Sequence, residues 1–154
     1  MRHGQRGFTM IELMTVLVVI GILAVLAIPA FGDQLARRRL EGVATDLATD
    51  LQFARTQAVA NNAVVRLMTL STTQYVVRNA ANVDLKTVNL PNSITATNTV
   101  TVAYDALRGT ATFTNTPINL TSTQTTGQLR LDVNTMGRVN LCSPSGTLRG
   151  YATC

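Results

Sequence analysis

The amino-acid sequence predicts an α+β fold in which one long N-terminal helix packs on a C-terminal antiparallel β-sheet. Three observations support this prediction. Residues 8–28 are apolar except for Glu12, apolar side chains recur every three or four positions over 40–58, and the rest of the 154-residue chain is rich in Thr, Asn and Val. The first two patterns are typical of helix, whereas β-branched residues between turn signals are typical of strands.

The apolar segment 8–31 is long enough to be a transmembrane helix. With a rise of 1.5 Å per residue, its apolar run forms a helix of about 30 Å, which is the thickness of a bilayer core. Glu12 is the single charge in that run. Because a carboxylate in hydrocarbon costs about 2.5 kcal/mol or more, we expect Glu12 to have a function. A plain signal anchor is the simpler alternative.

The helix is predicted to continue as an amphipathic segment over 32–62. Pro29 removes one helix hydrogen bond and clashes with the preceding turn, so we expect a kink there. The helix is predicted to stop at Asn61 and Asn62. One face of this segment carries a stripe of apolar residues, namely Leu40, Val43, Ala44, Leu47, Leu51, Ala54 and Ala58.

Residues 63–154 are predicted to form a β domain, whose sheet covers the apolar stripe of the helix. Segment 104–126 carries the weakest pattern. Alternating apolar residues and turn signals such as Pro91-Asn92 indicate strands at about 63–71, 74–79, 83–90, 94–103, 110–114, 127–133, 137–142 and 147–152.

The start of the chain also resembles a known processing site. Gly7-Phe8-Thr9-Met10-Ile11-Glu12-Leu13 is similar to the motif of type IV pilins and type II secretion pseudopilins. The resemblance implies that a prepilin peptidase cuts between Gly7 and Phe8 on the cytoplasmic side and that Phe8 is then N-methylated. Residues 1–7 are therefore expected to be a cleaved leader. Pro29 also falls where pilin helices commonly have a proline.

Phe8 and Glu12 are expected to act as an assembly pair. The cleaved chain has an ammonium group on Phe8, and Glu12 lies one helical turn away on the same face. In a filament core, Glu12 of one subunit can neutralise the Phe8 amine of its neighbour. The resemblance implies that the partners are other pilin or pseudopilin subunits, the prepilin peptidase/methyltransferase and the inner-membrane assembly platform. It implies a single-pass protein of the bacterial inner membrane with a periplasmic C-terminal domain, which later enters a filament.

A second resemblance concerns residues 47–62, whose sequence is similar to the helix end of the H-type pseudopilin and FimT-like minor pilin branch (GspH/FimT). Two systems follow from it. We favour a minor pilin that joins or primes a type IV pilus, and the alternative is the H-type pseudopilin of a type II secretion system.

Cys142 and Cys154 are expected to form a disulfide after export to the periplasm, where disulfides form. Two free thiols are the alternative.

The sequence holds no constellation typical of an enzyme, a metal centre or a cofactor site. His3, the only histidine, lies in the predicted leader. The chain therefore lacks the histidines that a Ser-His or Cys-His catalytic pair or a His-based zinc site needs. We therefore expect a structural role and no cofactor.

DNA binding is the remaining alternative. Some FimT-like minor pilins take part in DNA uptake and use a Gly-Arg-x-Arg loop, of which Gly137-Arg138-Val139-Asn140 keeps only the first arginine. The chain has a net charge of +5. Arg108, Arg130 and Arg149 are candidates for a patch beside Arg138, which would bind DNA weakly and in a salt-sensitive way. Ordinary solubilising charge explains the same residues.

Another basic group, Arg37-Arg38-Arg39, follows the predicted span. It is either a solvated flank or a contact for anionic lipid headgroups and for acids on a neighbouring subunit, with Asp46 and Asp50 as the candidates.

Overall fold

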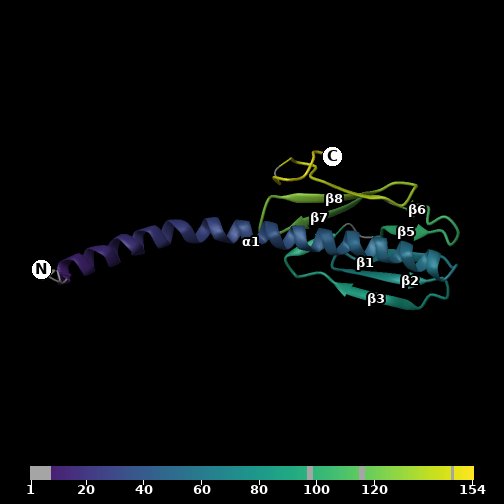
Figure 1. The fold of residues 1–154 in the computed structure, drawn as a ribbon, viewed down its shortest axis with the longest axis horizontal. Coiled ribbons are helices and arrows are strands. Elements are labelled where there is room, and N and C mark those ends of the chain that lie inside the picture. The colour runs from purple at the N-terminus through teal and green to yellow at the C-terminus, as the bar shows by residue number, and fades with distance from the viewer. Residues whose placement is uncertain (1–7, 97–98, 115–116, 147) are drawn as a thin grey trace, which may run out of the picture. The chain divides into compact units, whose positions relative to one another are not determined.

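The structure, a computed structural model, describes residues 8–96, 99–114, 117–146 and 148–154, and the side chains of residues 26–30 lie outside the description. Within these residues, one helix is followed by strands (Figure 1). The elements are α1 (Met10–Ala60), β1 (Val65–Ser71), β2 (Gln74–Asn79), β3 (Asp84–Asn89), β4 (Ile94–Ala96), β5 (Thr101–Tyr104), β6 (Ala111–Thr114), β7 (Ile118–Ser122), β8 (Gln128–Val133) and β9 (Val139–Cys142). The predicted α+β class is confirmed. The chain divides into two compact units, Met1–Leu35 and Ala36–Cys154.

The first unit contains the apolar part of α1. Its large apolar side chains are exposed on all sides of the helix, from 50% for Val16 to 82% for Phe8. A helix that is apolar all round is normally covered by protein or lipid. Among the helices of the described residues, none combines the length and the apolarity needed to cross a membrane. The predicted kink at Pro29 and part of the predicted span 8–31 fall on side chains outside the description, so both stay predictions.

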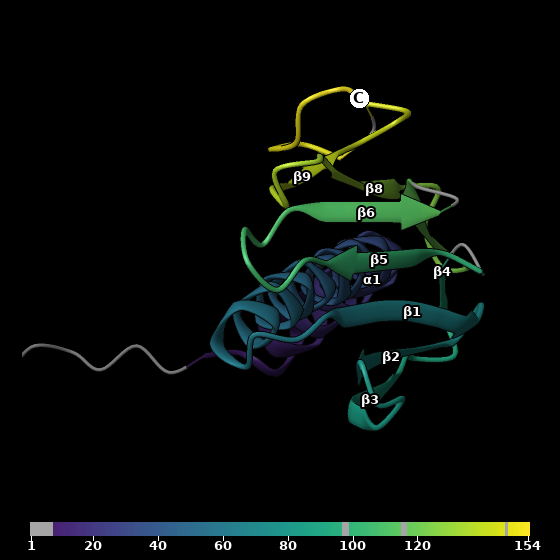
Figure 2. The same ribbon diagram turned by 90° about the vertical axis from the view of Figure 1, so that its right-hand side faces the viewer.

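The second unit contains the rest of α1 and two antiparallel sheets. The larger sheet has the strand order β3-β2-β1-β5-β6, and the smaller one has the order β4-β7-β8-β9. Figure 2 shows β1 and β5, the paired inner strands of the larger sheet, next to α1. The prediction that antiparallel strands pack on the helix is confirmed, and the structure divides these strands between two sheets.

The division into two sheets occurs inside the predicted strand 94–103. That segment forms two strands, because β4 pairs with β7 in the smaller sheet whereas β5 pairs with β1 in the larger one. Thr99, between them, has a φ of 58°, a left-handed conformation that no strand accommodates. The chain thus changes sheets at this point.

Two further strand predictions need correction. β7 lies between the predicted strands 110–114 and 127–133, where no strand was expected, and it pairs with both β4 and β8. The predicted strand 147–152 does not form in its described part, residues 148–152, and the nearest pairing is an isolated bridge between Ser143 and Thr153. Packing rather than pairing holds this segment, because Leu148 is buried against Gly127.

The core of the second unit lies between α1 and the two sheets. The apolar stripe predicted for the helix is confirmed, and Val43 is its one partly buried member. The larger sheet adds Val65 and Leu67, which alternate inward along β1, and the smaller sheet adds Leu129 and Leu131 of β8. The side chains of Leu40, Ala44, Leu47, Leu51, Ala54 and Ala58 are all fully buried.

One carboxylate lies inside this helix–sheet interface. Asp50 on α1 is 3% exposed and accepts hydrogen bonds from the Tyr75 hydroxyl of β2 (2.8 Å) and from Lys86 Nζ of β3 (2.6 Å). Burial, together with the bond to Asp50, raises the pKa of Tyr75 above its usual range. The expectation that Asp50 pairs with Arg37–Arg39 of a neighbouring subunit is therefore wrong, because its own chain occupies both carboxylate oxygens.

Candidate functional site

The predicted processing site lies at the start of α1. Gly7 is outside the described residues, whereas Phe8 and Thr9 precede the first helical residue, Met10. The hydroxyl of Thr9 accepts a bond of 3.4 Å from the backbone N–H of Glu12, and the Thr9 carbonyl accepts one of 3.2 Å from Leu13. Thr9 is thus the N-cap of the helix, and Glu12 stands in the first turn, where the helix dipole favours a negative charge.

The Glu12 carboxylate is free to meet a charge from another molecule. Its side chain is exposed, and among the described residues nothing donates a hydrogen bond to it or forms an ion pair with it. The neighbouring large apolar side chains are exposed as well. The pairing of Glu12 with the Phe8 amine of a neighbour stays a prediction, and this geometry leaves the carboxylate available for it.

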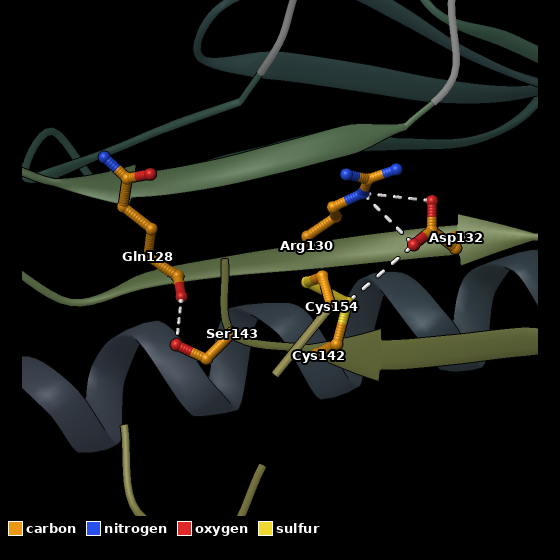
Figure 3. Close-up of a disulfide and its surroundings, with 6 residues drawn as sticks. All are labelled: Gln128, Arg130, Asp132, Cys142, Ser143 and Cys154. Atoms are coloured by element: carbon orange, nitrogen blue, oxygen red, sulfur yellow. Dashed lines mark hydrogen bonds and ion pairs between the residues drawn. A yellow bond between two sulfur atoms is a disulfide. The ribbon is translucent and has the colours of Figure 1, made fainter. Parts of the chain in front are cut away.

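The predicted disulfide between Cys142 and Cys154 is present, with their Cα atoms 5.0 Å apart (Figure 3). It fastens the C-terminal loop to β9. The backbone N–H of Ser143 donates to the Ala152 carbonyl (2.9 Å), and the Ser143 hydroxyl donates to the Gln128 carbonyl on β8 (3.2 Å). The disulfide therefore holds a loop against the smaller sheet, rather than the terminal strand that was predicted.

The four arginines proposed for DNA binding do not lie in one patch. Arg130 on β8 forms an ion pair with Asp132 at 3.1 Å, which offsets its charge (Figure 3). Arg149 lies near the start of β8, because its neighbour Leu148 packs on Gly127 there. Arg138 lies beyond the opposite end of the same strand.

Arg108 and Arg138, by contrast, lie on loops that touch. The β5–β6 loop, residues 105–110, meets the β8–β9 turn, residues 134–138, because the Ala111 N–H donates to the Thr135 carbonyl (2.9 Å). Both arginine side chains are exposed. DNA binding itself stays a prediction, with two of its four residues on one surface.

Arg55 is a further residue at this surface, and it was not predicted from the sequence. It lies on α1 beside the apolar stripe, and its Nε lies against Gly109 and Gly137 of the two loops. The sequence offers only a weak signal for it, namely a cation at the margin of the buried face. No group of three or more His, Cys, Asp or Glu side chains that could hold a metal ion occurs in the part of the chain that the structure describes.

Comparison with protein families finds two matches. Residues 2–28 match the prokaryotic N-terminal methylation motif. Residues 43–137 match the model of the type II transport protein GspH, so this match includes the second part of α1 and most of the β domain.

Similar sequences are fimbrial proteins. A fimbrial protein of Moraxella nonliquefaciens is 42% identical over 60 residues, which are 34% of this chain and 39% of the relative. The type IV major fimbrial protein FimA of Dichelobacter nodosus is 57% identical over 44 residues, 28% of each chain. A fimbrial protein of Pseudomonas aeruginosa is 37% identical over 72 residues, 47% of each chain. The chain thus spans less than half the length of these relatives.

A solved structure shares the fold over a longer stretch. The type IV minor pilin FimU of Pseudomonas aeruginosa is similar with a TM-score of 0.55 and 21% sequence identity, over 73% of this chain and 95% of that one. At this identity the likeness describes the fold, an N-terminal helix packed on antiparallel strands.

Proposed function

We propose that this chain, which belongs to the family of the type II transport protein GspH, is a minor pilin, a structural subunit that joins or primes a type IV pilus. Prepilin peptidase cleaves it between Gly7 and Phe8, and Phe8 becomes N-methylated. Before assembly the chain sits in the bacterial inner membrane through segment 8–31, with its C-terminal domain in the periplasm. The assembly platform then transfers it into the filament.

The observation that carries this proposal is the exposed apolar helix with its free carboxylate. Large apolar side chains from Phe8 to Val25 are exposed, and no described residue pairs with the Glu12 carboxylate that stands among them. In a filament, neighbouring helices cover the apolar surface and the Phe8 amine of a neighbour neutralises Glu12. The methylation motif over residues 2–28 and the fimbrial relatives support the same role.

Mass spectrometry of filaments sheared from the cell surface tests the proposal. We expect peptides of this chain in the filament fraction, with an N-terminal peptide that begins at methylated Phe8. Absence of the chain from purified filaments, while it is present in the membrane, would contradict a place in the pilus.

The alternative proposal is the H-type pseudopilin of a type II secretion system, and the match to the GspH model favours it. Deletion of the gene separates the two roles. Loss of pili with normal protein secretion supports the minor pilin, whereas a secretion defect with normal pili supports the pseudopilin.

A further inference from the structure

Three arginines meet at the end of the β domain where α1 ends. Arg55 lies in the last turns of the helix, Arg108 in the β5–β6 loop and Arg138 in the β8–β9 turn, and we call this surface the arginine pole. Within the described residues, no carboxylate forms an ion pair with any of the three guanidinium groups. Asp105 of the β5–β6 loop accepts a hydrogen bond from the backbone N–H of Arg108 (3.1 Å) and offsets part of the charge of that arginine. The pole therefore presents a net positive charge.

Arg55 is held in a recess rather than displayed on the surface. A Cβ atom on Gly109 would lie 3.0 Å from Arg55 Nε, and one on Gly137 would lie 3.2 Å from the same atom. Both glycines have a left-handed backbone, with φ values of 61° and 75°. The two turns thus bring bare backbone against the guanidinium, and any larger residue in either place would displace it.

A buried hydroxyl without a partner lies next to this recess. Tyr104 on β5 is fully buried, and its ring atom Cε1 lies 3.1 Å from the Cβ position of Gly137, where Arg55 also lies. In the described residues, nothing hydrogen-bonds to the Tyr104 hydroxyl. An unsatisfied buried polar group costs about 1–3 kcal/mol, but this hydroxyl is itself buried, so it is not presented to a ligand in this structure.

Large apolar side chains surround the charged groups. Leu107 is 79% exposed beside Arg108, and Met136 is 68% exposed two residues before Arg138. Each loop thus presents one apolar side chain together with one arginine. A shallow groove along the end of α1 opens beside Arg55, and it is lined by Gln52, Arg55, Thr56, Val59 and Ala60.

We propose that the arginine pole binds a carboxylate carried by an apolar segment of another protein. A carboxylate accepts two parallel bonds from a guanidinium, which matches Arg55 in its recess. Apolar residues on both sides of the carboxylate cover Leu107 and Met136. This inference goes beyond the proposed function, since it holds for either filament that the chain can join.

The same features favour a protein over DNA as the ligand. Arginine and methionine are enriched at protein interfaces, where apolar contacts surround a few charged anchors. A phosphodiester backbone, in contrast, mainly needs exposed cations and offers nothing to cover two large apolar side chains. Arg55 lies in a recess, which a carboxylate on a side chain of a protein segment can enter.

Fluorescence anisotropy with the full chain in dodecyl maltoside micelles tests the proposal. The probe is a fluorescein-labelled peptide in which Leu and Glu alternate, and the matched peptide has Gln in place of Glu. Empty micelles provide the baseline for both peptides. We expect the Glu peptide to bind about tenfold more tightly than the Gln peptide, because one charge-assisted pair is lost.

Three substitutions locate the binding site. We expect Arg55→Gln to weaken binding of the Glu peptide about tenfold and Arg138→Gln to weaken it about threefold or more. Arg149→Gln removes the same charge far from the arginine pole and is expected to change the affinity less than about twofold. Arg138 is exposed, so Arg138→Gln keeps the test valid even if Arg55→Gln fails to fold.

Three outcomes would overturn the proposal. Equal binding of the Glu and Gln peptides would exclude a carboxylate. Equal effects of Arg55→Gln and Arg149→Gln would reduce the pole to unspecific charge. Tighter binding of a 20-base-pair DNA duplex than of the Glu peptide, with the same dependence on Arg55, would assign the pole to nucleic acid.

Discussion

Lys86, the only lysine of the chain, donates a hydrogen bond of 2.6 Å to Asp50, a residue 36 positions earlier. The bond joins β3, an edge strand of the larger sheet, to the second part of α1. The Lys86 side chain is about half exposed (47%), whereas that of Asp50 is almost fully buried (4%). The pair thus fixes how the helix sits on the sheet, and water reaches only its cationic end.

Asp50→Ala is expected to lower the free energy of unfolding by about 2–4 kcal/mol, because it leaves the Tyr75 hydroxyl buried without its acceptor and Lys86 without its partner. Urea unfolding followed by tyrosine fluorescence measures the change. Asp46→Ala is the matched control, an exposed acid one turn earlier on the same helix, with an expected effect within about 0.5 kcal/mol. Equal effects of the two substitutions would contradict a role for the pair.

Ionisation of the buried Tyr104 is expected to lower the stability of the protein in alkali. Burial raises its pKa to about 12, with the nearby Arg55 acting in the opposite direction. In the unfolded chain a tyrosine ionises near pH 10, so between pH 10 and 12 the native state keeps a proton that the unfolded state has lost. The free energy of unfolding therefore falls as pH rises through this window, by about 1 kcal/mol from pH 10 to 11, and is unaffected by this group below it.

Tyr104→Phe provides the comparison for this pH dependence. We expect the variant to lose less stability than the parent in urea unfolding at pH 9, 10 and 11, while Tyr75, whose pKa is also raised, contributes equally to both proteins. Parallel losses in parent and variant would show that Tyr104 does not titrate in this range.

Replacement of both Cys142 and Cys154 by alanine is expected to lower the free energy of unfolding by about 3 kcal/mol, because the open loop gains entropy in the unfolded chain. Urea unfolding with and without dithiothreitol checks this value. The reductant should destabilise the parent by a similar amount and leave the double variant unchanged. An effect of the reductant on the double variant would point to a cause other than the disulfide.

Gly137→Ala is expected to lower the free energy of unfolding by about 3 kcal/mol, because the new Cβ would lie 2.7 Å from the Gly109 carbonyl oxygen. Gly146→Ala is the matched control. Both glycines have positive φ, but the nearest atom to a Cβ on Gly146 is 3.6 Å away, so only left-handed strain of about 1 kcal/mol is expected there. Thermal unfolding of the two variants compares them, and equal losses would rule out the clash.

Glu12→Ala is expected to reduce the incorporation of the chain into filaments while its amount in the membrane stays unchanged. The physical reason is that the Phe8 ammonium of a neighbour would be buried without a partner, at a cost of about 3–5 kcal/mol. Immunoblots of sheared filaments and of membranes measure both amounts, with Asp46→Ala as the control. Normal incorporation of Glu12→Ala would refute the assembly pair.

The elements with a strong local pattern were predicted well. The helix, its buried stripe from Leu40 to Ala58 and the first two strands were all placed within about two residues, because each depends on a period visible in a short stretch. The strand β7 was missed, since it is short and lies among threonines. The strand predicted at 147–152 was wrong, because an apolar residue such as Leu148 is buried in a packed loop as readily as in a paired strand.

The candidate site was only partly readable. The resemblance at Gly7–Leu13 located the processing motif, and the export to the periplasm that it implies led to the predicted pairing of the two cysteines. The basic surface was predicted less well, because Arg130 turned out to be paired with Asp132 and Arg149 to lie at the other end of β8. Arg55 was not among the residues predicted for this surface.

The sequence by itself determined the family, the long helix with its buried face, and the cysteine pair, because periodicity and contiguous motifs are properties of the chain alone. Only the tertiary structure decided that the strands form two sheets, that Asp50 meets Lys86, and that Arg55 lies between Gly109 and Gly137. These relationships join residues that are tens of positions apart. They follow from which strands pair and how loops pack on the helix end, and no local pattern in the chain encodes either.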